Sequence, residues 1–171
     1  MLSLKRYIVC DVETSGLSPK HGGRVIEIGA VACEEGQIVE EFGTLINVDC
    51  SIHWAAERVH GISRRMLAGM PEPEEVWRAF QVFIGGCPVV AHNATFDAAF
   101  LRHEMTMLGM HMNNRFFCSL ALSRKCLPHL PNHRLATVAQ HILGALPPTI
   151  RLHRALDDAR LAAKIWMALD R

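Results

Sequence analysis

The chain has 171 residues, of which 50% are hydrophobic and 20% are charged, and its formal net charge is +1. This composition is typical of one globular domain, which we expect to span residues 1–171, and it excludes a disordered or fibrous chain. The small net charge also excludes a global field that would attract a polyanion, so any phosphate-binding surface has to be local.

The six cysteines are scattered and include no Cys-x-x-Cys pair, which argues against a zinc module. Several of them, such as Cys10, lie in apolar runs, where free thiols behave as small buried hydrophobes, and this favours a reducing compartment. The N-terminus lacks the pattern of a signal peptide, and no run reaches the roughly 18 apolar residues needed to span a bilayer. We therefore expect a cytoplasmic protein that does not contact membranes.

Three strands are predicted in the first third of the chain. Residues 7–12 form a short, almost entirely apolar run, as in a strand buried on both faces, and a loop containing Gly16 and Pro19 follows it. Two further strands, at 25–33 and 38–48, are joined by a polar turn that contains Gly36. These strands are expected to form an antiparallel meander.

Helices and strands alternate in the rest of the chain. After an irregular segment around His60-Gly61-Ile62, apolar residues recur at helical spacing over 76–84, and Gly85-Gly86 ends that helix. Strands are predicted at 88–92 and 115–118, and further helices at 96–108, 120–127, 135–143 and 159–169. The expected fold is therefore an α/β architecture in which helices flank a mixed sheet.

Cationic side chains are concentrated in one part of the sequence. Between Met105 and Leu156 there is no Asp or Glu, and the Lys and Arg residues there are Arg115, Arg124, Lys125, Arg134, Arg151 and Arg154. Two interpretations stay open, because clustering in the sequence does not establish a shared face: separate solvated side chains, or a wall that contacts phosphate groups.

Two acidic residues mark the end of the first predicted strand. Asp11 and Glu13 are separated by one residue, so both side chains point to the same side of the strand. Together they form half of a cation site, but acidic pairs at strand ends are also common in ordinary loops. The pair therefore needs partners from elsewhere in the chain.

Asp97 is the first candidate partner. On a helix that begins near Phe96, it shares the apolar stripe of Phe100 and Leu101, where a carboxylate requires compensation. An acid in the first turn also suits the helix dipole, and both interpretations can hold. The segment from His92 to Asp97 follows a predicted buried strand, the position where active-site loops of α/β sheets gather.

The C-terminal helix supplies another acid. Periodicity places Asp158 on the same face as Leu161 and Ile165, which is the apolar face. Its neighbour Asp157 aligns instead with Arg160 on the solvated face, so we expect Asp157 to cap the helix start or to remain in solvent.

A histidine precedes this acid by five residues. His153 is expected in the loop that follows Pro147-Pro148, from which it can lean back toward Asp158. No buried Lys or Arg is spaced so that it could neutralise the acidic clusters, so cations have to hold them together. Oxygen ligands without thiolates match hard ions such as Mg²⁺ or Mn²⁺, and two ions would suit phosphodiester hydrolysis, with His153 accepting the proton of the attacking water.

Three motifs resemble those of the DEDDh, or DnaQ-like, exonucleases, a family that includes the proofreading epsilon subunit of bacterial DNA polymerase III. They are Asp11-Val12-Glu13-Thr14, His92-Asn93-Ala94-Thr95-Phe96-Asp97 and His153-Arg154-Ala155-Leu156-Asp157-Asp158-Ala159. The motifs occur in the family's order, and the resemblance covers nearly the whole chain. A histidine rather than a tyrosine five residues before the last Asp places the chain in the His branch of the family.

The resemblance implies an RNase H-like fold and a site for two metal ions. In that site, Asp11, Glu13 and Asp158 hold the first ion, Asp11 bridges to the second, and Asp97 supports the second directly or through water. His153 is implied to be the general base. The residues implied to lie near the terminal nucleotide of the substrate are Thr14, Gly16, His60, Asn93 and Phe96.

The implied activity is metal-dependent 3′-to-5′ exonuclease action on the 3′ ends of single-stranded DNA, with release of nucleoside monophosphates. RNA or short oligonucleotides are the alternative substrates, since contacts to a 2′-hydroxyl cannot be located in the sequence. An inactive nucleic-acid-binding or polymerase-docking module is the alternative from a different class, and retention of all five chemical positions argues against it. Polymerase-associated relatives usually continue beyond the last helix, so we expect a free-standing nuclease, or a domain of something longer, rather than a resident proofreading subunit.

Overall fold

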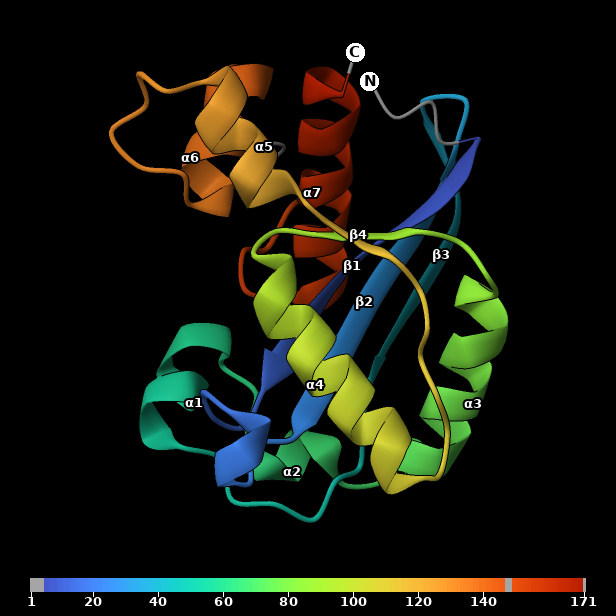
Figure 1. Cartoon of the computed structure of the whole chain (residues 1–171). Helices are drawn as coiled ribbons and strands as arrows, with labels where there is room; N and C mark the ends of the chain where they lie inside the picture. The colour runs from blue at the N-terminus through green and yellow to red at the C-terminus, as the bar shows by residue number, and fades with distance from the viewer. Residues whose placement is uncertain (1–4, 147–148, 171) are drawn as a thin grey trace.

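In the computed structural model, which describes residues 5–146 and 149–170, five strands form one mixed sheet in the order β3-β2-β1-β4-β5 (Figure 1). The antiparallel meander consists of β1 (Arg6–Thr14), β2 (Val25–Glu34) and β3 (Gln37–Leu45). The strands β4 (Val89–Ala91) and β5 (Phe116–Cys118) then add to β1 in parallel. The predicted mixed sheet of an α/β fold is confirmed.

The described helices are η1 (Pro19–His21), α1 (Trp54–His60), α2 (Arg64–Leu67), α3 (Pro73–Ile84), α4 (Ala94–Met107), α5 (Ser119–Cys126), α6 (Leu135–Leu143) and α7 (Ala155–Leu169). Five of them, α3 to α7, correspond to the predicted ones. Pro147 and Pro148, which the sequence predicts to lie in a loop, are outside the described residues.

The largest differences from the prediction are one segment and two boundaries. The segment expected to be irregular contains α1 and α2, and α1 is capped by His53, whose Nδ1 accepts a hydrogen bond from the backbone N–H of Ala55. Histidine is not among the preferred capping residues, so the sequence gives no signal there. In addition, β3 ends at Leu45 rather than at residue 48, and α7 begins at Ala155, four residues earlier than expected.

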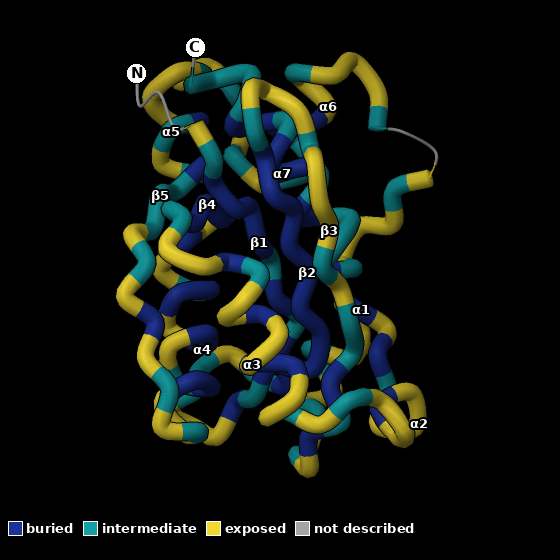
Figure 2. Tube along the Cα trace, turned by 90° about the vertical axis from the view of Figure 1, so that its right-hand side faces the viewer, coloured by how far each residue is buried: buried dark blue, intermediate teal, exposed yellow. Residues whose placement is uncertain are grey.

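The sheet has a layer of helices on each face. Alternate residues of each strand point to opposite faces and therefore belong to different cores. Ile8 and Cys10 of β1 belong to the core formed with α3 and α4, whereas Tyr7 and Val9 belong to the core formed with α7. Figure 2 shows that β1 and β2 are buried along most of their length between these layers. Because Asp11 and Glu13 continue the odd-numbered series, they are expected on the face that α7 covers.

A buried ion pair attaches α4 to the start of β2. Glu104 is 1% exposed, and its carboxylate accepts hydrogen bonds from Arg24 Nε at 2.8 Å and Nη2 at 2.9 Å. The backbone N–H of Val25 donates to the same carboxylate at 2.9 Å. A buried carboxylate is stable only when such partners compensate it, so the pair fixes the helix on the sheet.

The described helices include none whose length and apolar character would let it cross a bilayer.

Candidate active site

Asp11 and Glu13 lie near the end of β1, in the part of the strand that β4 does not pair with. β4 pairs with only two residues of β1, both before Asp11, so α4 can approach the rest of the strand. The chain turns into α4 at Asn93, whose φ of 77° is left-handed, and Asp97 in the first turn accepts a hydrogen bond from the backbone of Val12. The second motif therefore docks its acid directly onto the strand that carries the first motif.

The third motif approaches from the other side of the sheet. His153 lies in the turn immediately before α7, and its backbone N–H donates to Asp158 Oδ2 at 3.0 Å. Asp158 is 6% exposed and faces inward from the first turn of α7, as the periodicity predicts. The side chain of His153 is exposed, so it borders the acids from the solvent side.

The expectation for Asp157 is wrong. Its side chain is 14% exposed, and it binds two groups instead of capping the helix or remaining in solvent. Oδ2 accepts the backbone N–H of Arg151 at 3.0 Å, and Oδ1 accepts a hydrogen bond from Arg160 at 2.7 Å. The reason is that α7 starts at Ala155, which places Asp157 inside the first turn rather than ahead of it.

The predicted catalytic residues converge on one place. Glu13, His153 and Asp158 each offer a ligand atom, and these three atoms lie within 4.8 Å of one another. The negative charges of Asp97, Asp158 and Glu13 all raise the pKa of Asp11, so Asp11 lies within electrostatic reach of the other three acids. Side chains from positions 11, 13, 97, 153 and 158 thus form a single cluster.

Burial is the largest cause of a raised pKa at each of the four acids. The pKa of Asp11 rises well above its usual range, that of Glu13 to about 8, that of Asp97 to about 7 and that of Asp158 to about 6. Neighbouring acids add to the shift at Asp11 and Glu13, whereas backbone hydrogen bonds oppose it at Asp97 and Asp158. Near neutral pH the cluster therefore retains protons unless cations replace them.

One buried oxygen shows that the residues present fit a divalent cation. Oδ1 of Asp158 is buried and has no hydrogen-bond partner among the described residues, although Oδ2 is bound by the His153 backbone. A buried polar atom without a partner is rare, and a divalent cation bound by the acidic cluster would give this oxygen a partner. Carboxylate oxygens with one imidazole nitrogen match hard divalent ions better than thiophilic ones.

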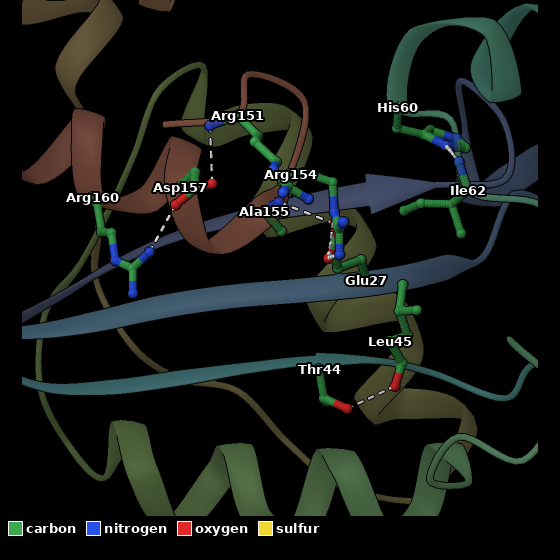
Figure 3. Close-up of polar contacts among 10 residues, drawn as sticks. All are labelled: Glu27, Thr44, Leu45, His60, Ile62, Arg151, Arg154, Ala155, Asp157 and Arg160. Atoms are coloured by element: carbon green, nitrogen blue, oxygen red, sulfur yellow. Dashed lines mark hydrogen bonds and ion pairs between the residues drawn. The ribbon is translucent and has the colours of Figure 1, made fainter. Parts of the chain in front are cut away.

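The sequence reasoning missed one acid and its partner. Glu27 of β2 is 6% exposed, and Arg154 binds its carboxylate through Nε at 3.0 Å and Nη2 at 2.6 Å (Figure 3). Glu27 raises the pKa of Glu13, so a fifth carboxylate contributes to the electrostatic field of the cluster. The guanidinium of Arg154 neutralises the charge of Glu27. The available signal was a single charged residue inside the otherwise apolar run from Val25 to Cys33, since a charge in such a strand needs a partner.

A pocket of about 630 Å³ adjoins the acids. Its lining includes Glu13 together with three of the predicted substrate-binding residues, Thr14, Gly16 and His60. The Thr14 hydroxyl donates to the Gly16 carbonyl at 2.8 Å, and this hydrogen bond stabilises the turn after β1, which borders the pocket. Nδ1 of His60 accepts the backbone N–H of Ile62 at 2.9 Å (Figure 3), and its buried Nε2 has no hydrogen-bond partner within the described ranges.

The remaining predicted substrate-binding residues lie beside Asp97 instead. Asn93 is exposed at the start of α4, and Phe96 is half-buried with its ring centroid 4.9 Å from that of Phe100. Neither residue lines the pocket that contains His60. Their role in substrate binding stays a prediction.

The cationic stretch contains residues in two different situations. Arg154 is bound to Glu27, and Arg115 lies over the ring of Phe117 at 4.7 Å from its centroid. The residues that remain exposed are Arg115, Arg124, Lys125, Arg134 and Arg151. These side chains are therefore the ones available as a phosphate-contacting surface.

A comparison with protein-family models matches residues 8–166 to the exonuclease family. The chain belongs to this family. The matched segment includes all five clustered residues, Asp11, Glu13, Asp97, His153 and Asp158. The family expected from the three motifs is therefore confirmed.

Curated relatives match over almost the whole chain. It is 35% identical over 159 residues to DNA polymerase III PolC-type of Clostridium perfringens, covering 93% of this chain and 11% of that protein. It is 36% identical over 165 residues to a DNA polymerase III subunit epsilon-like protein of Rhodobacter capsulatus, covering 95% and 23%. With the 3′-5′ exonuclease DinG of Bacillus subtilis it shares 32% identity over 170 residues, covering 98% and 18%. The chain thus spans less than a quarter of the length of these relatives.

A solved structure of similar size confirms the fold. Exonuclease X in complex with 5′ overhanging duplex DNA superposes with a TM-score of 0.78 at 27% identity. The match covers 95% of this chain and 90% of that one. The RNase H-like exonuclease fold implied by the motifs is therefore confirmed for this family member.

Proposed function

We propose that this chain is a 3′-to-5′ exonuclease that uses two divalent ions, Mg²⁺ or Mn²⁺, to hydrolyse phosphodiester bonds at the 3′ ends of single-stranded DNA. The observation that carries the proposal is the acidic cluster of Asp11, Glu13, Asp97 and Asp158, with His153 at its solvent side, which opens onto the pocket lined by Glu13. We also propose that residues 1–171 act as one exonuclease domain, because the family match runs from residue 8 to residue 166.

The proposed assignment of ligands is the one that the three family motifs imply. Glu13, Asp158 and Asp11 would hold one ion, and Asp11 and Asp97 would hold the second. When bound, the two ions supply activation of the attacking water and stabilisation of the charge on the leaving oxygen. The unpartnered Oδ1 of Asp158 supports this assignment, because a bound metal ion would be a partner for this buried oxygen.

The proton of the attacking water goes to His153 in this proposal. Its imidazole is exposed and lies beside Glu13 and Asp158, so a water molecule at the solvent side of the cluster can donate to it. The backbone of the same residue is bound to Asp158, which ties the base to a ligand of the ion. His153 then returns the proton to solvent after the nucleotide leaves.

The pocket beside Glu13 is proposed to receive the terminal nucleotide. Burial lowers the pKa of His60, so its ring is neutral near neutral pH, and the residue lines this pocket. A neutral imidazole can exchange a hydrogen bond with a sugar hydroxyl or a base edge. The pocket also has an apolar part, formed by Leu17, Val59 and other residues, against which a base can pack.

DNA as the substrate is supported by the relatives. The matching proteins are named as DNA polymerase III components and as a 3′-5′ exonuclease, and the similar solved structure holds duplex DNA with a 5′ overhang. The exposed cations Arg115, Arg124, Lys125, Arg134 and Arg151 provide local positive charge for the phosphate backbone on a chain whose net charge is only +1. For the cell, we propose a reducing compartment, the cytoplasm, because all six cysteines are free thiols.

Two labels on one oligonucleotide test the direction and the class of the activity. With Mg²⁺, a 5′-labelled single strand should shorten one nucleotide at a time, and a 3′ label should appear at once as a mononucleotide. Chelation of the metal and Asp11→Asn should both abolish the reaction. Early release of a 5′ mononucleotide would contradict the direction, and binding without any metal-dependent shortening would favour the docking-module alternative.

Matched DNA and RNA oligonucleotides at one fixed salt concentration test the substrate. We expect a higher kcat/KM on DNA, and an equal or higher value on RNA would replace DNA by RNA in the proposal. The salt concentration has to be fixed because contacts to phosphate groups make binding salt-dependent on either polymer.

A further inference from the structure

The turn that carries His153 is held from both sides by side chains outside the acidic cluster. On its N-terminal side, Asp157 accepts the backbone N–H of Arg151 at 3.0 Å. On its C-terminal side, Arg154 binds Glu27, and the same carboxylate accepts the backbone N–H of Ala155 at 3.1 Å (Figure 3). Every one of these contacts fixes backbone within three residues of the imidazole.

Glu27 is placed by the sheet so that it can hold this turn beside the acids. It lies directly opposite Glu13 in the antiparallel register of β1 and β2, so the two side chains share one face of the sheet. Its side chain is 8% exposed and that of Arg154 is 34% exposed, which makes the pair mostly buried. A buried charge pair fixes geometry well, because moving one partner away leaves the other charge uncompensated.

The backbone of the turn requires such a restraint. His153 has a φ of 62°, in the left-handed region that residues other than glycine rarely adopt. Strained residues of this kind persist only where the surrounding structure over-determines them. Two residues later, α7 lies so close to β2 that a side chain at Gly29 would overlap the backbone of Ala155 and Leu156.

We infer that Glu27 and Arg154 are positioning residues: their ion pair holds the His153 turn on β2 so that the imidazole faces Glu13 and Asp158. This inference rests on the proposed exonuclease function for its kinetic consequences, but its geometric content does not depend on the substrate. Glu27 and Arg154 also act on the pKa of Glu13 through their charges, but the inference concerns their hold on the His153 turn.

The chain offers a matched control. Arg24 and Glu104 form the same kind of pair, a bidentate arginine on a buried glutamate that also accepts a backbone N–H, but they attach α4 to β2 and not the His153 turn. Arg24→Ala therefore reports what the loss of such a pair does to folding alone. Arg154→Ala reports the same loss at the turn.

Kinetics of the full chain with Mg²⁺ on single-stranded DNA separate positioning from folding. At a temperature where all variants are folded, Arg154→Ala should lower kcat by at least about tenfold with KM within about threefold of wild type. Arg24→Ala should keep kcat within about twofold while lowering the melting temperature by as much or more. Arg154→Lys should retain more of kcat than Arg154→Ala, because it keeps the charge but not the bidentate geometry. Equal kcat values in Arg24→Ala and Arg154→Ala would overturn the inference.

A double-variant cycle identifies the residue through which Arg154 acts. If it acts by placing the base, adding Arg154→Ala to His153→Ala should cost less than about twofold further in kcat, because nothing remains to be positioned. Multiplication of the two single losses would overturn the inference.

The imidazole signals of His153 in metal-free protein give a readout that needs no activity. Assigned by their loss in His153→Ala, these NMR signals should shift or broaden in Arg154→Ala and stay in place in Arg24→Ala. If wild type proves to have no nuclease activity, the proposed function fails, and these signals still decide the positioning role. Unchanged signals in Arg154→Ala would refute that role even in an active enzyme.

Discussion

His153 is the one member of the cluster that is exposed and carries no negative charge, and this difference separates its role from that of the acids. In its proposed role as general base, His153 contributes to the chemical step, so His153→Ala should lower kcat by about 10²- to 10⁴-fold. The Mg²⁺ concentration for half-maximal rate should change by less than about threefold, because the carboxylates remain. Titration of the rate with Mg²⁺ checks both values, and a parallel loss of metal affinity would make His153 a ligand instead.

Asp158 illustrates how a single charge can oppose stability until a cation arrives. The folded protein raises the pKa of Asp158 to about 6, chiefly through burial, so the ionised form destabilises the metal-free protein at pH 8. Asp158→Asn should therefore raise the metal-free melting temperature at pH 8 by roughly 5 °C, which corresponds to about 2 kcal/mol in a domain of this size.

Calorimetry with and without Mg²⁺ checks this expectation. The increase in melting temperature that Mg²⁺ gives to the wild type should be largely absent in Asp158→Asn, since the variant lacks one ligand charge. Asp157→Asn is the matched control, because Asp157 binds Arg151 and Arg160 and should not gain stability from loss of its charge. A lower metal-free melting temperature in Asp158→Asn would contradict the proposed electrostatics.

Which single residues could be predicted depends on whether the signal is local. Helical periodicity distinguishes Asp158 from Asp157, because both belong to one continuous helix. The partnership of Glu27 with Arg154 joins residues 127 positions apart, so it requires the docking of α7 on β2 before it becomes visible. Local sequence patterns carry no information about a contact between residues so far apart in the chain.

At the level of elements, α7 approaches β2 closely at Gly29. A Cβ atom at Gly29 would overlap backbone atoms of Ala155 and Leu156, which cannot move without displacing α7. We therefore expect Gly29→Ala to lower the free energy of unfolding by at least about 3 kcal/mol, the upper part of the range for overpacking. Denaturant unfolding measures this change.

Gly43 provides the control for that substitution. It lies opposite Gly29 in the pairing of β2 with β3, but a Cβ atom there would meet only the Leu156 side chain, at 3.2 Å and beyond. Because that side chain can adjust, Gly43→Ala should change the free energy of unfolding by less than about 1 kcal/mol. Similar effects of both substitutions would show that α7 does not lie as close to β2 as described.

Elements whose sequence carries an apolar pattern were predicted, and those held by other means were not. The buried strands and the core-facing helix α3 show runs or periodicities, with Val76, Trp77, Phe80 and Ile84 all buried. The helix α1 buries only His60 and depends on the unusual His53 cap, so neither periodicity nor capping preference reveals it. The pocket lined by α1 was for this reason visible only in the structure.

For the whole molecule, the acidic cluster couples stability to pH. The pKa values of Glu13, Asp97 and Asp158 are raised in the folded state, to about 8, about 7 and about 6, so the folded protein binds more protons than the unfolded chain between these values and the ordinary range near 4. This contribution to stability is fully present below about pH 4 and is lost as the pH rises through about 6 to 8. The cluster should therefore make the metal-free protein less stable at pH 8 than at pH 5.5.

Mg²⁺ should reverse this dependence, because cations and protons compete for the same carboxylates. The increase in melting temperature on adding Mg²⁺ should be several degrees larger at pH 8 than at pH 5.5, as measured by calorimetry in chelator-treated and Mg²⁺-containing buffers. A metal-induced increase that is the same at both pH values would contradict a cluster that is protonated when it lacks metal.

The site joins side chains from the first strand and from the last helix, at positions 11 and 158. During synthesis on the ribosome, a chain that has emerged only as far as α6 possesses Asp11, Glu13 and Asp97 but neither the base nor the remaining acid. Under the proposed function, a chain that stops before His153 therefore lacks both the base and one of the proposed metal ligands, and hydrolysis begins only once α7 has docked on β2.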